Sequence, residues 1–309
     1  MGKHKFYTQG ETKGIEMNDS FEKTTCYLCK KEDDQPVFLK GKPITKGQFG
    51  YTAYPRICRG CGFIYLNPRW NKNKYNQFYK EHYDELYRLE IKPDYGIDGV
   101  VLHMKEIWKR IAASCDKRYI ENIRNVLDVG CGSGYGLKYI KDQLGNVKIF
   151  GIESSPDCCE TLQGKVGAKL ITIDFDSDWT ADYQGHFDLV IMRHVLEHAL
   201  EPIETLMRLR EVLSKNGILY IAVPDMMHPR TVLRDYDKWW EYWFRAIHLF
   251  YFCKETLFAT LEKAGLYPKA YGEENEEVWC LASTDRSCKK YYEKNVYQKQ
   301  IQILNKYLP

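Results

Sequence analysis

A short apolar run followed by closely spaced glycines, residues 125–136 (N-V-L-D-V-G-C-G-S-G-Y-G), constrains the fold more than any other segment. The apolar run is typical of a buried strand, and the glycines let the backbone turn sharply and approach a ligand closely. A second strand, 148–153, ends at Glu153, which is placed to accept hydrogen bonds from ribose hydroxyls. Strand, loop and acid together favour a nucleotide-binding α/β fold over a glycine-rich turn without a ligand.

The spacing of the glycines distinguishes between classes of nucleotide. A nicotinamide-binding loop carries G-x-G-x-x-G, but the third position is Tyr135 when counted from Gly130 and Leu137 when counted from Gly132. The dinucleotide fingerprint therefore fails. The pattern D-x-G-x-G-x-G that begins at Asp128, followed by a strand ending in an acid, resembles the class I methyltransferases that use S-adenosylmethionine (SAM).

The chain alternates strands and helices after residue 124, and the resemblance spans roughly 125–284. This alternation predicts an α/β fold with a parallel sheet covered on both faces. The resemblance implies a Rossmann-like, seven-stranded sheet with a reversed final strand. The predicted strands are 125–130, 148–153, 169–173, 187–192, 218–224, 266–272 and 278–284. The predicted helices are 134–144, 156–166, 201–214 and 254–265.

The same resemblance implies a set of residues that bind SAM. Its methionine part is expected at residues 128–134, its ribose at Glu153 and its adenine near Asp174 and Phe175. The complete predicted set is Asp128, Gly130, Cys131, Gly132, Gly134, Glu153, Ser154, Asp174, Phe175 and Arg193.

Two C-x-x-C units, Cys26/Cys29 and Cys58/Cys61, precede this region in a chain that has 11 cysteines. Each unit can present two thiolates to one tetrahedral Zn²⁺, so the spacing predicts a structural zinc site. A β-hairpin within residues 38–54 would accommodate the distance between the units. A redox dithiol pair is the competing interpretation.

The segment that starts at the second cysteine pair, residues 58–69 (C-R-G-C-G-F-I-Y-L-N-P-R), leads into a tyrosine-rich helix. It resembles the N-terminal region of bacterial sugar-modifying methyltransferases, including deoxysugar C-methyltransferases and relatives in polysaccharide pathways. Tyr79 and Tyr83 either close a substrate pocket or pack ordinarily. Leu102, with Ile107, Trp108 and Ile111, is expected to face the core. The predicted organisation is a flexible N-terminus (1–20), a zinc-ribbon-like module (21–70), a helical linker that caps the pocket (71–123) and a SAM-binding domain (124–309).

The sequence H-V-L-E-H, from His194 to His198, follows the predicted strand 187–192. Ligands bind at the carboxyl ends of parallel strands, which makes His194 and Glu197 candidates for catalysis. The spacing resembles E-x-x-E-H in ubiquinone O-methyltransferases and small-RNA 2′-O-methyltransferases, where such residues bind a divalent metal. Here His194 replaces the first acid. Glu197 and His198 could instead hold the loop by hydrogen bonds, and a second divalent metal at His194, Glu197, His198 and His248 is the alternative.

A second histidine motif, H-L-F-Y-F at 248–252, resembles the H-L-x-Y-F of the sugar methyltransferases, whose histidine lies at the substrate. The resemblance implies that His248 is a general base for an acceptor hydroxyl. Ile247 stands where those enzymes often carry an acid, which argues against C-methylation. A buried structural histidine and a fourth metal ligand remain open. The aromatic run 239–244 either stacks on a sugar or packs on the core.

Bulk composition limits the remaining choices. The net charge of +3 lacks the basic imbalance of a nucleic-acid binder. There is no 20-residue apolar run and no apolar signal core at residues 1–6, so a cytoplasmic enzyme is expected. The expected function is SAM-dependent methyl transfer to a hydroxyl of a small molecule, a sugar or a sugar-derived metabolite. The alternatives are an RNA methyltransferase that grips RNA with its zinc ribbon and a non-catalytic SAM-fold scaffold.

Overall fold

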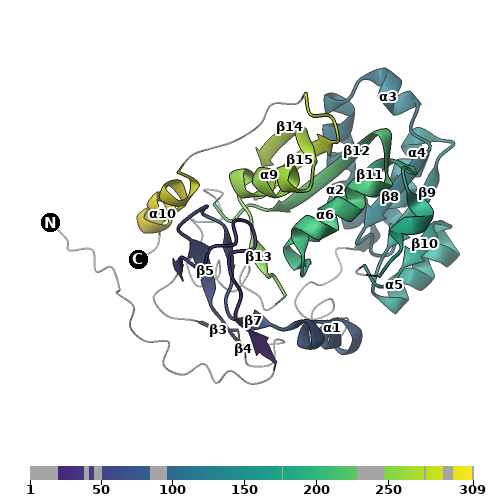
Figure 1. Ribbon diagram of the computed structural model, residues 1–309. Coiled ribbons are helices and arrows are strands. Elements are labelled where there is room, and N and C mark those ends of the chain that lie inside the picture. Colours follow the sequence, from purple (N-terminus) through teal and green to yellow (C-terminus); the bar gives the residue numbers. More distant parts are fainter. Residues whose placement is uncertain are drawn as a thin grey trace.

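The computed structural model describes residues 20–37, 42–44, 51–83, 96–175, 177–227, 247–274, 276–287 and 295–307. The N-terminal segment before residue 20 and the aromatic run 239–244, both discussed above, lie outside these described residues. Figure 1 shows a large sheet flanked by helices and, beside it, a smaller group of short strands formed mainly by the N-terminal part of the chain. Within the described residues, no helix is both long and apolar enough to cross a membrane.

The large sheet has seven strands in the order β10-β9-β8-β11-β12-β15-β14. Its strands are β8 (Asn125–Val129), β9 (Lys148–Ile152), β10 (Lys169–Thr172), β11 (Phe187–Arg193), β12 (Leu213–Pro224), β14 (Tyr267–Glu274) and β15 (Glu277–Ser283). β15 is antiparallel to both of its neighbours, and the other neighbouring strands run parallel. The α/β, Rossmann-like class and the reversed final strand are thereby confirmed.

Each face of this sheet has its own hydrophobic core because side chains alternate along a strand. On β11, Val190 and Met192 pack with residues of α6 and α9, whereas Leu189 and Ile191 pack with residues of α2 and α4. Figure 1 shows α6 and α9 together on one side of the sheet. Burial on both faces explains why the parallel strands are continuous apolar runs in the sequence.

The helices lie close to their predicted positions. Those around the sheet are α4 (Tyr135–Leu144), α5 (Pro156–Thr161), which continues as η2 (Leu162–Val166), α6 (Pro202–Val212) and α9 (Lys254–Lys263), with short turns η3 (Thr180–Tyr183) and η4 (Leu196–His198). The linker forms α1 (Lys72–Glu81), α2 (Gly96–Ser114) and α3 (Lys117–Glu121).

One core prediction in α2 is wrong. Leu102 is 59% exposed, whereas Met104, Ile107 and Ile111 are buried. These three share one face of a helix with 3.6 residues per turn, and Leu102, two positions before Met104, lies on the opposite face. Trp108 packs at the edge of the core as a partly buried residue.

The N-terminal part forms a small sheet around the cysteine pairs. Its order is β13-β6-β5-β2, formed by β2 (Asp34–Pro36), β5 (Pro55–Cys58), β6 (Ile64–Leu66) and β13 (Phe250–Tyr251). The expected hairpin is present as β3 (Lys42–Ile44) with β4 (Tyr51–Ala53), and β1 (Phe21–Glu22) pairs with β7 (Arg69–Trp70). β13 comes from a part of the chain far from the others, immediately after His248 and Leu249. The edge strand β13 of the small sheet is therefore part of the second histidine motif, H-L-F-Y-F at 248–252.

The C-terminal helix α10 (Val296–Tyr307) lies next to this small sheet (Figure 1). Gln300 donates its side-chain N–H to the carbonyl of Gly62 at 2.6 Å. Gly62 has φ +75°, and a Cβ there would lie 2.8 Å from the backbone nitrogen of Tyr297. Glycine at this position thus allows both the turn after the second cysteine pair and the close approach of α10.

Candidate functional site

The glycine loop after β8 adopts a conformation that glycine tolerates best. Gly130, Gly132 and Gly134 have φ values of +73°, +55° and +79°, all in the left-handed region. A Cβ on Gly130 or Gly134 would collide with a neighbouring side chain, whereas one on Gly132 would meet nothing within 4 Å. The loop is therefore packed at its two ends and open at its centre, where a ligand can approach the backbone.

Glu153, at the end of β9, is buried and bonded to the loop and to the start of α5. Its Oε2 accepts from the backbone N–H of Gly132 at 2.8 Å. Its Oε1 accepts from the N–H groups of Ser154 and Ser155, each at 2.9 Å. These three bonds orient the carboxylate. Each carboxylate oxygen has two lone-pair positions, so Oε2, which accepts one bond, can accept another from a ribose hydroxyl.

Asp128, the fourth residue of β8, lies buried beneath the loop. Burial and the neighbouring charge of Glu153 raise its pKa to about 8, while the charge of Arg193 acts in the opposite direction. A cationic ligand near Asp128 would favour its ionised form. SAM carries a sulfonium and an ammonium group, which makes this site electrostatically suited to it.

Other residues predicted to contact SAM follow strands of the same sheet. Cys131 is buried, and its Sγ would lie 2.6 Å from a Cβ at Gly151. Asp174 and Phe175 follow β10, and the carbonyl of Phe175 accepts hydrogen bonds from Trp179 and Arg208. Parallel strands bring their carboxyl ends to one edge, so the segments that follow β8, β9 and β10 lie along the same edge of the sheet.

His194 lies in an ion-pair network that the sequence did not indicate. Glu277, the first residue of β15, accepts from Arg193 Nε and is 3.0 Å from His194 Nε2, and its other oxygen accepts from Arg110 of α2. Burial alone would raise the pKa of Glu277, but the His194 hydrogen bond and the Arg193 charge hold it well below its usual range. His194 has φ +55°, unusual for a residue with a side chain. The network therefore fixes the loop that follows β11.

A second group unites Glu197, His198 and His248. One side-chain ligand atom from each lies within 4.8 Å of the others, an arrangement that could hold a metal ion. The rings of His198 and His248 meet edge to face with centroids 4.7 Å apart. His194 is not a member of this group, so the structure brings together three of the four residues considered for a divalent metal.

Tyr79 of helix α1 and the backbone carbonyl of Ile247 orient the ring of His198. His198 Nδ1 lies 3.1 Å from the carbonyl oxygen of Ile247 and 3.1 Å from the Tyr79 hydroxyl. Because a carbonyl oxygen can only accept, we assign the hydrogen to Nδ1, which leaves Nε2 of the neutral ring with a lone pair toward Glu197. Tyr75 also donates its hydroxyl hydrogen to the carbonyl of His198. Tyr79 thus contacts the site, while Tyr83 stacks on Tyr79.

Val195 connects this histidine group with the glycine loop. Its Cγ2 would be only 2.6 Å from a Cβ on Gly130. The loop that carries Glu197 and His198 therefore packs directly on the loop predicted to hold SAM. A methyl donor bound at Gly132 would lie at the same edge of the sheet as the histidine group, because β8 and β11 are parallel neighbours.

A sequence model of a protein family, described as a methyltransferase domain, matches residues 102–269, which is more than half of the chain. The chain belongs to this family. It therefore contains a methyltransferase domain of the class I, SAM-dependent type, and the seven-stranded sheet is the sheet of that domain.

Individual relatives share less than a third of their aligned residues with this chain. The mitochondrial ubiquinone biosynthesis O-methyltransferase of Saccharomyces cerevisiae is 28% identical over 167 residues, covering 48% of this chain and 45% of the relative. The ribosomal protein L11 methyltransferase of Thermosipho africanus is 25% identical, covering 37% and 42%. The chain thus spans less than half the length of these curated relatives. The structure of mitomycin 7-O-methyltransferase has a TM-score of 0.50 at 15% identity, covering 68% and 60%, and this likeness shows the fold alone.

Beside the methyltransferase domain, the four cysteines of the small sheet form one cluster. Cys26 Sγ lies 3.5 Å from Cys61 Sγ, Cys29 Sγ lies 3.4 Å from Cys58 Sγ, and all four sulfurs lie within 4.8 Å of one another. Sulfurs around tetrahedral Zn²⁺ are about 3.8 Å apart for Zn–S bonds of about 2.3 Å. None of the four forms a disulfide. The donor set fits a tetrahedral zinc ion.

The two cysteine pairs have the same backbone turn. The N–H of the residue after each second cysteine bonds to the carbonyl of the first, Lys30 to Cys26 at 2.7 Å and Gly62 to Cys58 at 2.8 Å. Lys30 and Gly62 both have positive φ, +61° and +75°. These matching turns direct the two thiols of each pair toward the same point.

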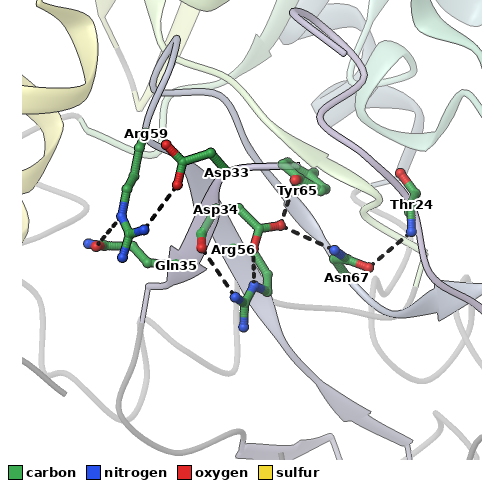
Figure 2. Close-up of polar contacts among 8 residues, drawn as sticks. All are labelled: Thr24, Asp33, Asp34, Gln35, Arg56, Arg59, Tyr65 and Asn67. Atoms are coloured by element: carbon green, nitrogen blue, oxygen red, sulfur yellow. Dashed lines mark hydrogen bonds and ion pairs between the residues drawn. The ribbon is translucent and has the colours of Figure 1, made fainter. Parts of the chain in front are cut away.

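Asp34 connects the strands of the small sheet (Figure 2). Its carboxylate accepts from Arg56 Nε at 2.7 Å, from the Tyr65 hydroxyl at 2.6 Å and from Asn67 Nδ2 at 3.1 Å. These partners come from β5, from β6 and from the residue after β6. Burial, followed by the bond to Asp34, raises the pKa of the Tyr65 phenol, which stays a donor. The network fixes β6, the strand on which β13 pairs beside the methyltransferase domain.

Proposed function

We propose that this chain transfers a methyl group from SAM to a hydroxyl group of a small molecule, a sugar or a sugar-derived metabolite, in the cytoplasm. The observation that carries the proposal is the packing of Val195 on Gly130, because it joins the loop suited to SAM to the group Glu197, His198 and His248. A methyl donor and a proton acceptor on adjoining loops are the two parts that O-methylation needs.

In the proposed reaction the acceptor oxygen attacks the methyl carbon of SAM in line with the sulfur–carbon bond. The oxygen–carbon bond forms, the carbon–sulfur bond breaks, and S-adenosylhomocysteine leaves. The hydroxyl proton passes to His248, the proposed general base, which is buried at 6% exposure beside His198. Neutral imidazole is a suitable base near pH 7 because its ordinary pKa is about 6.5.

A divalent cation held by Glu197 and His198 is part of the proposal. His248 is then not a ligand, because a neutral imidazole has one lone pair and needs it to accept the proton. The fit rests on the tautomer of His198, whose Nδ1 faces the carbonyl of Ile247 and whose Nε2 lies 3.9 Å from Glu197 Oε1. When bound, such a cation lowers the pKa of the acceptor hydroxyl as a Lewis acid. His194 is proposed to support this loop through Glu277.

We also propose that Cys26, Cys29, Cys58 and Cys61 hold a structural Zn²⁺. The role of the cysteine module would be to shape the acceptor pocket, because β13 of its sheet begins two residues after His248. With four thiolates the ion has no open coordination position, so its contribution is to the fold of this segment.

The experiment is methyl transfer from radiolabelled SAM to a panel of sugars, sugar phosphates, nucleotide sugars and RNA. Label in a saccharide, with an equal amount of S-adenosylhomocysteine released, is the expected result. Label in RNA alone would refute the proposal. Absence of SAM binding by calorimetry would also refute it and would favour the scaffold alternative. Glu153→Ala serves as the donor-site variant and should weaken SAM binding about tenfold or more.

A further inference from the structure

A charged cavity of about 250 Å³ lies between the cysteine module and the methyltransferase sheet. Its lining residues are Glu22, Arg69, Lys72, Leu200, Glu201 and Arg208. Pockets that enclose a whole small-molecule ligand measure about 300–1,000 Å³. The cavity is therefore of a size for one chemical group of a larger ligand.

The lining has one more basic than acidic side chain. Three cationic side chains come from β7, from α1 and from α6, whereas the two acids are Glu22 and Glu201. Glu22 is neutralised by Arg69 Nε at 2.8 Å. Of the other charged lining residues, Lys72 and Arg208 are basic and Glu201 is acidic, which leaves a net positive charge for an anionic group.

Arg69 is a suitable anion ligand. It is 8% exposed, and a guanidinium carries five N–H donors. Within the described part of the chain, Glu22 and the carbonyl of Leu200 take one donor each. The remaining donors form the planar fork that matches phosphate oxygens.

Lys72 adds a charge at the positive end of a helix. It is exposed, it is the first residue of α1, and the first turn of that helix contains no acid. The N-terminal end of a helix carries a partial positive charge, so the backbone and the ammonium act in the same direction. Lys72, at this end of α1, lines the cavity.

The cavity adjoins the proposed reaction centre. Arg69 bonds to the carbonyl of Leu200, two residues after His198, and its guanidinium lies 5.9 Å from the ring of Phe250, two residues after His248. Two residues of chain span at most about 7 Å. With the 3.3 Å bond from Arg69 to Leu200, the backbone of His198 lies within about 10 Å of the guanidinium, a distance that a sugar together with its phosphate can span.

We propose that this cavity binds a phosphate or diphosphate group carried by the methyl acceptor. The assignment to the acceptor rests on the proposed function, whereas the anion site itself does not. The cavity holds the phosphorylated end, and the hydroxyl to be methylated extends toward His198 and His248. Specificity for a phosphorylated acceptor then comes from Arg69, Lys72 and Arg208.

The test is calorimetric titration of the full chain with inorganic phosphate and with pyrophosphate. Lys72→Gln should weaken binding about fivefold, and Glu201→Gln should strengthen it by a similar factor because it removes a like charge. Glu201 makes no side-chain bond that caps α6, so its replacement leaves the helix start intact. Lys80→Gln is the matched control, since it removes the same charge from an exposed residue at the far end of α1. It should leave the affinity unchanged.

The possible results test the anion site and the methyl-transfer function separately. No binding of either anion, or equal effects of Lys72→Gln and Lys80→Gln, would overturn the anion site. Tighter binding of pyrophosphate than of phosphate would identify a diphosphate acceptor, and the reverse order a monophosphate. Anion binding without methylation of any hydroxyl compound would refute the function alone. Methylation in which Lys72→Gln leaves the KM for a phosphorylated acceptor unchanged would refute the link between the cavity and the acceptor.

Discussion

Leu66 donates its backbone N–H to the carbonyl of Leu249 at 3.0 Å, and this bond joins the four-cysteine module to the residue after His248. β13, which follows, pairs with β6 through Phe250↔Tyr65 and Tyr251↔Ile64. The position of His248 therefore depends on a sheet that the cysteine cluster supports. A short strand of this kind is stable only when its partner strand is fixed.

Removing the metal from the cysteine cluster should release this segment. We expect one Zn²⁺ per chain by elemental analysis. Chelation or Cys29→Ser should lower the free energy of unfolding by about 3 kcal/mol or more, because metal binding contributes directly to folding. Cys115→Ser, which changes a half-buried thiol outside the cluster, should retain the zinc. A chain that melts identically with and without chelator would contradict this account.

The contact between Val195 and Gly130 can be tested with a matched pair of glycines. Gly130→Ala and Gly167→Ala both place a side chain at positive φ, which costs about 1–2 kcal/mol in the left-handed region. Only at Gly130 does the new Cβ also meet a neighbour, so denaturant unfolding should show a further loss of about 1–3 kcal/mol. Adding Val195→Ala to the Gly130→Ala variant removes the side chain that the new Cβ meets, so the double variant should recover part of the further loss in stability. Equal losses in the two single variants would show that the close contact is absent.

The buried carboxyl of Asp128 predicts a pH dependence. Folding raises its pKa from 3.8 to about 8, so the folded chain retains a proton that the unfolded chain has lost between these values. The contribution of Asp128 to stability is thus complete below pH 3.8 and declines as the pH rises toward 8. Relative to the native chain, Asp128→Asn should gain about 2 kcal/mol between pH 5.5 and 7.5 in unfolding experiments. Parallel stability curves for the two proteins would refute the buried, protonated carboxyl.

The histidine group should bind a divalent cation in addition to the zinc. Calorimetric titration of the zinc-loaded chain with Mn²⁺ is expected to show one site, weakened about tenfold or more in Glu197→Gln and in His198→Ala. His194→Gln should leave Mn²⁺ affinity unchanged, because His194 bonds to Glu277. An equal loss in His194→Gln would instead support the four-residue site considered from the sequence.

The strands of the large sheet were predictable because burial on both faces gives each one a continuous apolar run between turn residues. The sequence around Asp128 and Glu153 likewise predicted the fold of the glycine loop. Leu102 was misplaced because a helix with several apolar residues does not reveal locally which face meets the sheet.

Glu277 and β13 could not be predicted from local patterns. Glu277 reaches Arg193 only because β15 runs antiparallel, which brings its first residue to the carboxyl edge of the sheet. β13 has two residues, and its partner β6 lies far away in the chain. Pairings of this kind are set by tertiary packing, so sequence spacing carries no signal for them.

Catalysis by His248 is the central claim, and its replacement by alanine tests that claim most directly. His248→Ala should lower kcat by about 100-fold or more while the Kd for SAM changes less than about twofold. His103→Ala, which removes an exposed histidine of α2, is the control. Loss of turnover with retained SAM binding in His248→Ala alone is the predicted result. Near-normal turnover of His248→Ala would contradict the account.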